Sequence, residues 1–163
     1  MRERVGHRRI VTAAGLGGVA AIGPEPAESG YSRPMATNRS IVDAAGAPAA
    51  VGPYSHAVAA DGLLFCSGQI PLDPASGELV GDSAAEQAVR CLQNLAAVCD
   101  AAGASLADAV RVTVYLTDMS SFAEVNDAYA SFFPSDPPAR VAFGVVALPK
   151  GAQVEIDAVV ALR

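Results

Sequence analysis

The chain has 163 residues, 52% of them hydrophobic and 17% charged, which predicts one folded domain and excludes a largely disordered protein. Its net charge of −6 is unevenly divided: residues 1–34 carry five arginines and three glutamates, and the remainder carries six basic and fourteen acidic residues. An acidic body without a basic stripe argues against binding to nucleic-acid phosphates. The acidic body is compatible with a small anionic substrate, because one arginine beside the substrate outweighs the diffuse negative potential of the body.

The three cysteines, Cys66, Cys91 and Cys99, are odd in number and show no CxxC spacing. We therefore expect reduced thiols rather than a disulfide framework, and we expect Cys91 and Cys99 to be buried. Only two histidines occur, and no cluster of histidine, cysteine and aspartate indicates a metal site.

The N-terminal segment begins with basic residues and continues with a 14-residue apolar stretch, which is too short to span a membrane but is compatible with an export signal. The pair Arg8-Arg9 is typical of twin-arginine export, yet no clear A-x-A cleavage site follows. The alternative, which we favour, is a misassigned start with Met35 as the true first residue. We expect residues 1–37 to be a disordered extension of a cytoplasmic protein, or of an exported one if residues 1–34 are a signal.

The first half of the body contains a hairpin, a loop and a helix. Residues 52–68 predict two short strands joined by a tight Asp-Gly turn. Residues 70–81 are rich in proline and glycine and predict a loop with at most one short strand. A capping box at 83–86 then starts a helix, whose apolar residues recur at helical spacing and which ends at Gly103.

The second half of the body predicts three strands and one helix. Residues 109–118 alternate strictly, with Val110 and every second residue after it toward one face, as in a half-buried strand. A second capping box at 121–124 predicts another amphipathic helix, which a proline ends. Two strands follow, at about 139–147 and 152–162.

These elements predict an α+β domain over residues 38–163, in which two amphipathic helices cover one face of a mixed β-sheet in two layers. The other face of this sheet is too apolar for water, since Val159 and Ala161 share it with charged positions. Oligomerisation is the simplest way to bury that face.

Two charged residues of the last strands are candidates for catalysis. Arg140 follows two prolines at the start of one strand, and Glu155 lies among apolar residues of the next. A guanidinium grips a carboxylate through two parallel hydrogen bonds, and a glutamate can handle a water molecule. If the charged faces of the two strands coincide, these side chains line one cleft for a small carboxylic acid. The alternative is a weak ion pair at the surface.

Four more residues are weaker candidates: Tyr54, Ser67, Gly68 and Asn126. The turn after the second hairpin strand contains Ser67 and Gly68 and offers backbone donors and a hydroxyl to a substrate. Each residue also has an ordinary interpretation, as a packing tyrosine, a Ser-Gly turn or a helix-surface asparagine. The sequence contains no Ser-His-Asp arrangement and no phosphate-binding glycine loop.

The body of the chain, about residues 38–163, closely resembles the Rid family of enamine and imine deaminases, also called YjgF or L-PSP. Five motifs in the family's order carry the resemblance: GPYSHA (52–57), SGQIPLDPASGELVG (67–81), VNDAY (125–129), PPAR (137–140) and LPKGAQVEIDAV (148–159). Family members begin shortly before the first motif, which also supports a start at Met35.

The resemblance implies a chorismate-mutase-like fold and a homotrimer, with the sheets forming a central barrel and three clefts between subunits. It implies a hydrolase that needs no cofactor or metal and that converts enamines and imines such as 2-aminoacrylate to 2-keto acids and ammonia, like a 2-iminobutanoate/2-iminopropanoate deaminase. The partners it implies are 2-imino acids and copies of the same chain, not nucleic acid or a membrane.

The family's functional residues carry over by position. The resemblance gives Arg140 the role of binding the substrate carboxylate and Glu155 that of placing the attacking water. The substrate-binding positions fall on Tyr54, Ser67, Gly68, Asn126 and Ala142. Many members have Cys, Thr or Ser where this chain has Ala142, so the thiol ascribed to that position is absent and the cleft is larger. Since water is the expected nucleophile, we expect deamination to survive and substrate preference to shift.

Three other functions stay open. A pathway-specific paralogue acting on a different enamine is favoured by Ala142. A non-catalytic binder of small carboxylates would need the same arginine. An endoribonuclease, an activity also ascribed to the family, is disfavoured by the acidic body.

Overall fold

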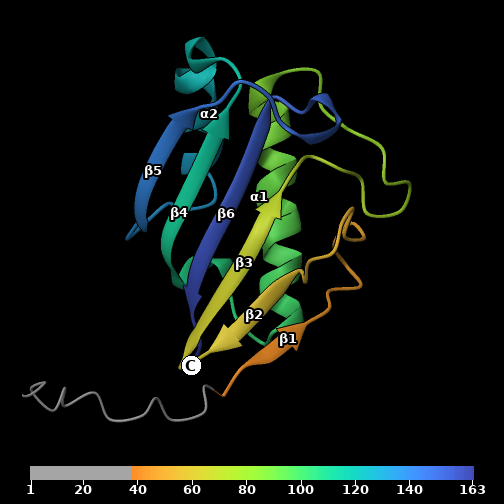
Figure 1. The fold of residues 1–163 in the computed structure, drawn as a ribbon. Helices are drawn as coiled ribbons and strands as arrows, with labels where there is room; N and C mark the ends of the chain where they lie inside the picture. The colour runs from red at the N-terminus through yellow and green to blue at the C-terminus, as the bar shows by residue number, and fades with distance from the viewer. Residues whose placement is uncertain (1–37) are drawn as a thin grey trace, which may run out of the picture. The chain divides into compact units, whose positions relative to one another are not determined.

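The computed structural model of the protein describes residues 38–163, in which one β-sheet carries two α-helices (Figure 1). The predictions for residues 1–37 lie outside this described part. The strands are β1 (Ser40–Val42), β2 (Ala57–Ala60), β3 (Leu63–Gln69), β4 (Ala109–Leu116), β5 (Ala139–Gly144) and β6 (Val154–Ala161). The helices are α1 (Ala84–Ala101) and α2 (Phe122–Ala130), and short 3₁₀ turns lie at Leu106–Asp108, Met119–Ser121 and Pro149–Gly151.

The sheet has the strand order β1-β2-β3-β6-β4-β5 and is mixed, because β4 and β5 pair in parallel and the other neighbours are antiparallel. Helix α1 packs against β3 and β6 and also against α2, so one face of the sheet is covered by helices. The predicted α+β architecture with two helices is confirmed. The last strand in the chain lies inside the sheet, which places Glu155 well away from either edge.

The hairpin of β2 and β3 is confirmed. Its turn residues, Asp61 and Gly62, have φ angles of 49° and 79°, the backbone that a two-residue turn with primed geometry requires. Strand β1, which extends the sheet beyond β2, was not predicted, because three residues are too few to show an alternating pattern.

Helix α1 begins as predicted, because Ser83 accepts a hydrogen bond from the Glu86 amide and the Glu86 carboxylate accepts from the Ser83 amide. The helix ends at Ala101, just before Gly103, whose φ of 71° suits a glycine at a helix C-terminus.

The second predicted capping box is wrong. The Ser121 side chain makes no capping hydrogen bond, because a 3₁₀ turn runs directly into α2 and Ser121 lacks the extended backbone of an N-cap. Asp118 caps the 3₁₀ turn instead, with its carboxylate accepting from the Ser120 amide at 2.8 Å.

The strict alternation predicted for β4 is wrong at Val110. The pairing with β6 shifts register between Ala109 and Arg111, so Val110 bulges out of the ladder and is 49% exposed. Beyond the bulge, Val112 and every second residue after it are buried as predicted.

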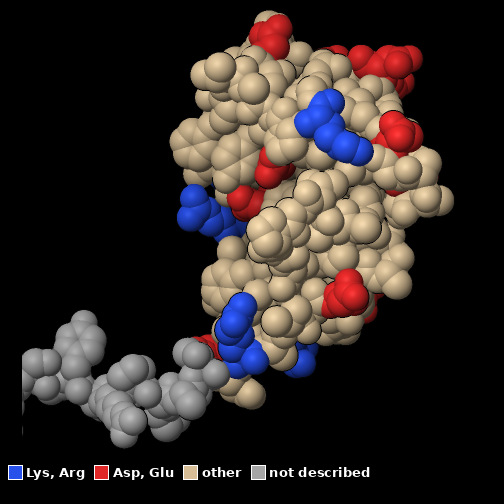
Figure 2. All heavy atoms as spheres, turned by 45° about the vertical axis from the view of Figure 1, so that its right-hand side comes forward, with Lys and Arg blue, Asp and Glu red and all other residues tan. Residues whose placement is uncertain are grey.

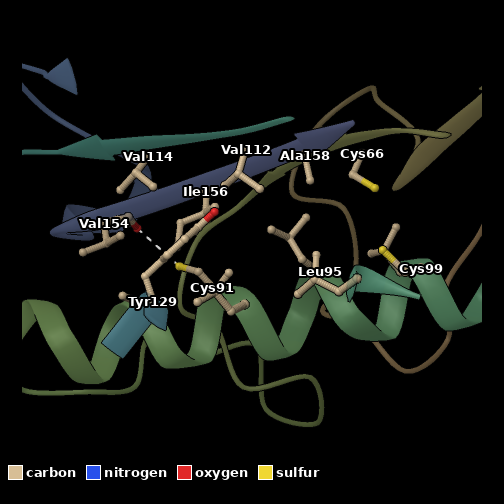
Figure 3. Packing of buried hydrophobic residues seen from close by; sticks show 14 of the residues in the cluster. Cys66, Cys91, Leu95, Cys99, Val112, Val114, Tyr129, Val154, Ile156 and Ala158 are labelled. Carbon is tan, nitrogen blue, oxygen red and sulfur yellow. Dashed lines mark hydrogen bonds between the residues drawn. The ribbon is translucent and has the colours of Figure 1, made fainter. Parts of the chain in front are cut away.

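The core lies between the sheet and the helices, and Figure 3 shows side chains from β4, β6 and α1 meeting there. Cys66, Cys91 and Cys99 are free, buried thiols within it, which confirms the prediction of reduced cysteines. The Cys91 thiol donates to the Val154 carbonyl oxygen at 3.6 Å, and burial raises the pKa of this thiol.

Within residues 38–163, no helix or loop covers the face of the sheet opposite the helices. A row of directly paired residues crosses it from β1 to β6, namely Ile41, Val58, Phe65 and Val159. Ile41 is 64% exposed and Phe65 is 47% exposed. An apolar strip of this kind is unusual on an isolated domain and indicates a surface for association. We call it the open face.

Candidate functional site

Glu155 opens onto a pocket of about 300 Å³ at the end of β3. The pocket is lined by Val51, Tyr54, Ser67, Gly68, Ile70, Pro149 and Glu155. These residues come from two strands and from three loops far apart in the chain. Apolar side chains therefore surround one carboxylate, a hydroxyl and a phenol, which is the usual makeup of a small-molecule site.

Gly68 lies directly against the Glu155 carboxylate. A Cβ atom built on Gly68 would lie 2.0 Å from Glu155 Oε1, so only glycine allows this approach. The ladder between β3 and β6 shifts by one residue between Cys66 and Gln69, so this close approach occurs at a bulge. Such bulges are frequent beside active sites, where they redirect side chains.

The protonated form of Glu155 is more favoured in this pocket than it would be in bulk water. Burial raises the pKa of Glu155, and the nearby Asp157 carboxylate raises it further. Asp157 itself accepts a hydrogen bond from the Tyr115 hydroxyl at 2.9 Å. A carboxyl group with a raised pKa in a pocket is suited to accept and return protons near neutral pH.

Hydrogen bonds hold the loop before β2 against the end of β3. The Ser67 hydroxyl donates to the Ser55 carbonyl oxygen at 2.7 Å, so its proton is already engaged within the chain. The Tyr54 hydroxyl accepts from the Val51 amide at 3.2 Å. Ser67 and Tyr54 therefore line the Glu155 pocket with fixed orientations.

His56 anchors the same loop from inside. Its Nδ1 accepts from the Ala44 amide at 3.1 Å, so Nε2 carries the hydrogen and donates to the Pro48 carbonyl oxygen at 2.9 Å. The Asp43 carboxylate also lies 3.0 Å from Nδ1, but this carboxylate is almost wholly exposed. Ion pairs at exposed positions contribute little to the stability of a fold.

Two buried polar side chains of α1 fix the loop that contributes Ile70. Asn94 donates to the carbonyl oxygens of Ile70 and Leu72 at 3.3 and 3.0 Å. Gln87 donates to the Gly81 carbonyl oxygen at 3.0 Å and accepts from the Gln153 amide at 2.7 Å. These bonds satisfy buried amides and hold the pocket wall in place.

Arg140 lies at a second pocket, of about 500 Å³, between α2 and the start of β5. Its lining consists of Asn126, Asp127, Tyr129, Ala130, Phe133, Pro137, Pro138 and Arg140. Asn126 and Arg140, two of the predicted site residues, thus line the same pocket. The guanidinium carbon lies 4.7 Å from the Tyr129 ring centroid and 5.8 Å from that of Phe122.

The condition for one cleft within a single chain, that the charged faces of the two strands coincide, is not met. Residues paired directly across a sheet point to the same side, and Arg140 pairs with Val112 whereas Glu155 pairs with Tyr115. Val112 and Tyr115 are three residues apart on β4 and so face opposite sides. Arg140 therefore faces the helices, and Glu155 lies on the open face. Local strand patterns could not reveal this, because they do not give the register between strands.

Ala142 shares the face of Arg140 and packs against the hydrophobic core beside α2. It lines neither the Glu155 pocket nor the Arg140 pocket. Within one chain, the small side chain of Ala142 therefore enlarges neither pocket.

Sequence reasoning missed Val51, Ile70 and Pro149 as pocket residues, because loops distant in sequence bring them together. It predicted only an amphipathic helix after residue 121, and helical spacing gave no sign that Phe122 and Tyr129 contact Arg140.

Within residues 38–163, the face drawn in Figure 2 shows no basic patch that would bind a polyanion. Figure 2 shows one face of the described part of the chain, where uncharged atoms predominate and basic side chains are few and scattered. Within residues 38–163, no group of three or more His, Cys, Asp or Glu side chains could hold a metal ion. None of the helices in that range is long and apolar enough to cross a membrane.

Comparison with known proteins matches this arrangement to one family. A family model described as Endoribonuclease L-PSP matches residues 44–162. The chain is 53% identical over 116 residues to a RutC family protein of Sinorhizobium fredii, covering 71% of this chain and 92% of the relative. It is 48% identical over 121 residues to the Bos taurus protein named 2-iminobutanoate/2-iminopropanoate deaminase, covering 74% and 88%. Among solved structures, RidA from the Antarctic bacterium Psychrobacter sp. is 41% identical and aligns with a TM-score of 0.73 over 76% of this chain and 99% of that one.

Proposed function

Because the chain belongs to the endoribonuclease L-PSP family, the Rid family that its motifs resemble, we propose that it hydrolyses 2-imino acids to 2-keto acids and ammonia. The observation that carries the proposal is a guanidinium without an acidic partner, found together with a pocket carboxylate of raised pKa. Among residues 38–163, the side chain of Arg140 makes no ion pair, and Glu155 lies beside a space the size of a small metabolite.

The proposed reaction uses each group for one step. Arg140 binds the substrate carboxylate through two parallel N–H donors and so orients the adjacent C=N bond. Glu155 takes a proton from water as the water oxygen adds to the imine carbon and passes that proton to the imine nitrogen, which gives a tetrahedral amino alcohol. Glu155 then takes the hydroxyl proton and delivers it to the amine nitrogen as the C=O bond forms and the C–N bond breaks, so that ammonia and the 2-keto acid leave. An imine is already electrophilic, so positioning supplies most of the acceleration.

We further propose that the working enzyme is a homotrimer in which Arg140 of one subunit faces the Glu155 pocket of another. Two features of the chain support this assembly. The two groups lie on opposite faces of one sheet, and the open face is apolar enough to need a cover.

The test of the activity is the release of 2-keto acid from freshly generated 2-aminoacrylate, with the wild type and Arg140→Ala measured side by side. We expect acceleration by the wild type and none by the variant. Arg140→Lys is the matched control, since it keeps the charge but loses the bidentate geometry, and it should retain only a small part of the activity. Full activity in Arg140→Ala would contradict the proposal.

A mixing experiment tests the shared site. In the proposal, Arg140→Ala chains are inactive and Glu155→Ala chains keep only a small residual activity, but refolded together they would form mixed trimers with one intact site each. Random assembly in equal amounts should restore about a quarter of the wild-type activity per subunit. No recovery, despite mixed trimers detected by mass, would show that both groups act from one chain.

The other candidate functions receive less support. The pathway-specific alternative rested on Ala142, which lines neither pocket of the chain. RNA cleavage would require a surface that holds phosphates, whereas residues 38–163 carry six basic and fourteen acidic side chains. A binder without catalysis would bind 2-keto acids yet leave the rate of imine hydrolysis unchanged.

A further inference from the structure

The guanidinium of Arg140 rests on two aromatic rings of α2. Its central carbon lies 4.7 Å from the Tyr129 ring centroid and 5.8 Å from the Phe122 ring centroid. Both distances fall within the range in which a cation is attracted by the electrons of an aromatic face. Phe122 and Tyr129 are seven residues apart, about two helical turns, so one side of α2 presents both rings to β5.

The Tyr129 ring is itself held firmly. It is only 6% exposed, and the Phe133 ring packs against it with the centroids 4.6 Å apart. Figure 3 shows the tyrosine reaching from α2 into the packed layer beneath the sheet. A cation placed on this ring therefore has a rigid support rather than a mobile surface side chain.

The Tyr129 hydroxyl contributes nothing evident to stability. It is buried, and no described atom is its hydrogen-bond partner. A buried hydroxyl without a partner destabilises a fold, and phenylalanine would remove that cost. The ring, rather than the hydroxyl, is thus the part of this residue that the contact with Arg140 uses.

The two rings hold Arg140 without occupying its hydrogen-bond donors. No hydrogen bond or ion pair joins its guanidinium to another group within residues 38–163, although Asp127 lines the same pocket. The N–H donors of a guanidinium lie at its planar edge, whereas an aromatic ring contacts its face. An acidic partner would fix the side chain equally well but would compete with a substrate carboxylate.

We propose that Tyr129 and Phe122 are positioning residues that hold the Arg140 guanidinium by its face, so that its edge is preset to receive the carboxylate of a substrate. This inference rests on the proposed function, because it assumes that a carboxylate binds there. Removing either ring leaves the charge in place and lets the side chain adopt many orientations. The loss should fall on the recognition of carboxylates rather than on the general integrity of the site.

Calorimetric binding tests this with two stable probes, 2-oxobutanoate and its uncharged amide, 2-oxobutanamide. The wild type should prefer the carboxylate, and Tyr129→Leu and Phe122→Leu should each lower that preference about tenfold. Tyr129→Phe keeps the ring and should keep the preference. The control is Val125→Ala, a core change on the same helix between the two rings, which should weaken both probes alike or neither.

The outcomes separate the inference from the proposed function. If the wild type prefers the carboxylate and the ring-removing variants do so equally, the positioning role is wrong and the proposed function is untouched. If the wild type shows no preference, both are wrong. If Tyr129→Leu fails to fold, Phe122→Leu carries the test, since Phe122 is only partly buried.

Discussion

The contact between Gly68 and Glu155 provides the sharpest test of the site, through the substitution Gly68→Ala. The new methyl carbon would lie 2.0 Å from Glu155 Oε1, and real contacts of this kind are essentially never closer than 3.0 Å. The carboxylate oxygen must therefore move by about 1 Å, and a misplacement of that size lowers a rate about 100-fold. We expect kcat for imine hydrolysis to fall by this factor.

The fold should tolerate the same change. The atoms that the methyl group meets all belong to the Glu155 side chain, whose end can swing away, and the φ angle of Gly68 is not in the left-handed region. We expect the free energy of unfolding to stay within about 1 kcal/mol of the wild type. Gly46→Ala is the matched control, because its methyl group would meet only the Ala97 Cβ at an ordinary 3.6 Å, and its activity should be unchanged.

A double-mutant cycle decides whether Glu155 transmits the effect. If Gly68→Ala acts only by displacing this carboxylate, the substitution should cost nothing further in a Glu155→Ala background. The reasoning is refuted if Gly68→Ala keeps wild-type kcat, or if it lowers activity equally in both backgrounds.

Four further predictions concern the pocket and the open face. The pKa of Glu155 lies above the ordinary 4.5, so activity should decline as pH falls through this raised pKa and the carboxylate becomes protonated. Asp157→Asn removes the neighbouring charge that raises this pKa further, and it should therefore move the acid limb of the pH–rate profile to lower pH. The same shift makes ionisation of Glu155 unfavourable in the folded state, so the wild type should lose stability relative to Glu155→Gln as pH rises through that pKa, which thermal unfolding at several pH values measures. His56→Ala removes two buried hydrogen bonds of the pocket loop and should destabilise the fold by about 2 kcal/mol in denaturant titrations; an unchanged midpoint would contradict the anchoring role. Phe65→Glu places a charge on the open face and should yield monomers by light scattering, whereas an unchanged oligomer would mean that association uses another surface.

The elements that sequence predicted well are those that short-range rules determine. The Asp61-Gly62 turn and the capping box at Ser83 depend on backbone geometry within four residues, and both occur as predicted. The capping box at Ser121 failed although its residues fit the pattern, because the preceding 3₁₀ turn already sets the backbone there. A local signal therefore holds only where no neighbouring element imposes a different entry into the helix.

The arrangement of the site depends on pairing between strands, which local patterns do not contain. The alternation within β5 and within β6 was predicted correctly for Arg140 and Glu155. The relation between the two strands was not, because β4 lies between them and sets their register. The two candidate catalytic residues were therefore identified as individuals, but their placement on opposite faces needed the structure.

The strand order also explains why the two charges can occupy these faces. Glu155 lies on an interior strand, so it avoids burial in the core only by pointing to the open face. Arg140 points toward the helices, and on an interior strand this direction would bury its charge. Because β5 is the edge strand, the guanidinium instead stays exposed over the rings of α2. Under the proposed function, each chain thus carries two halves of a site that it cannot join by itself. In the proposed homotrimer, covering the open face and completing the site are one event, so a change that prevents association should abolish activity even with Arg140 and Glu155 intact.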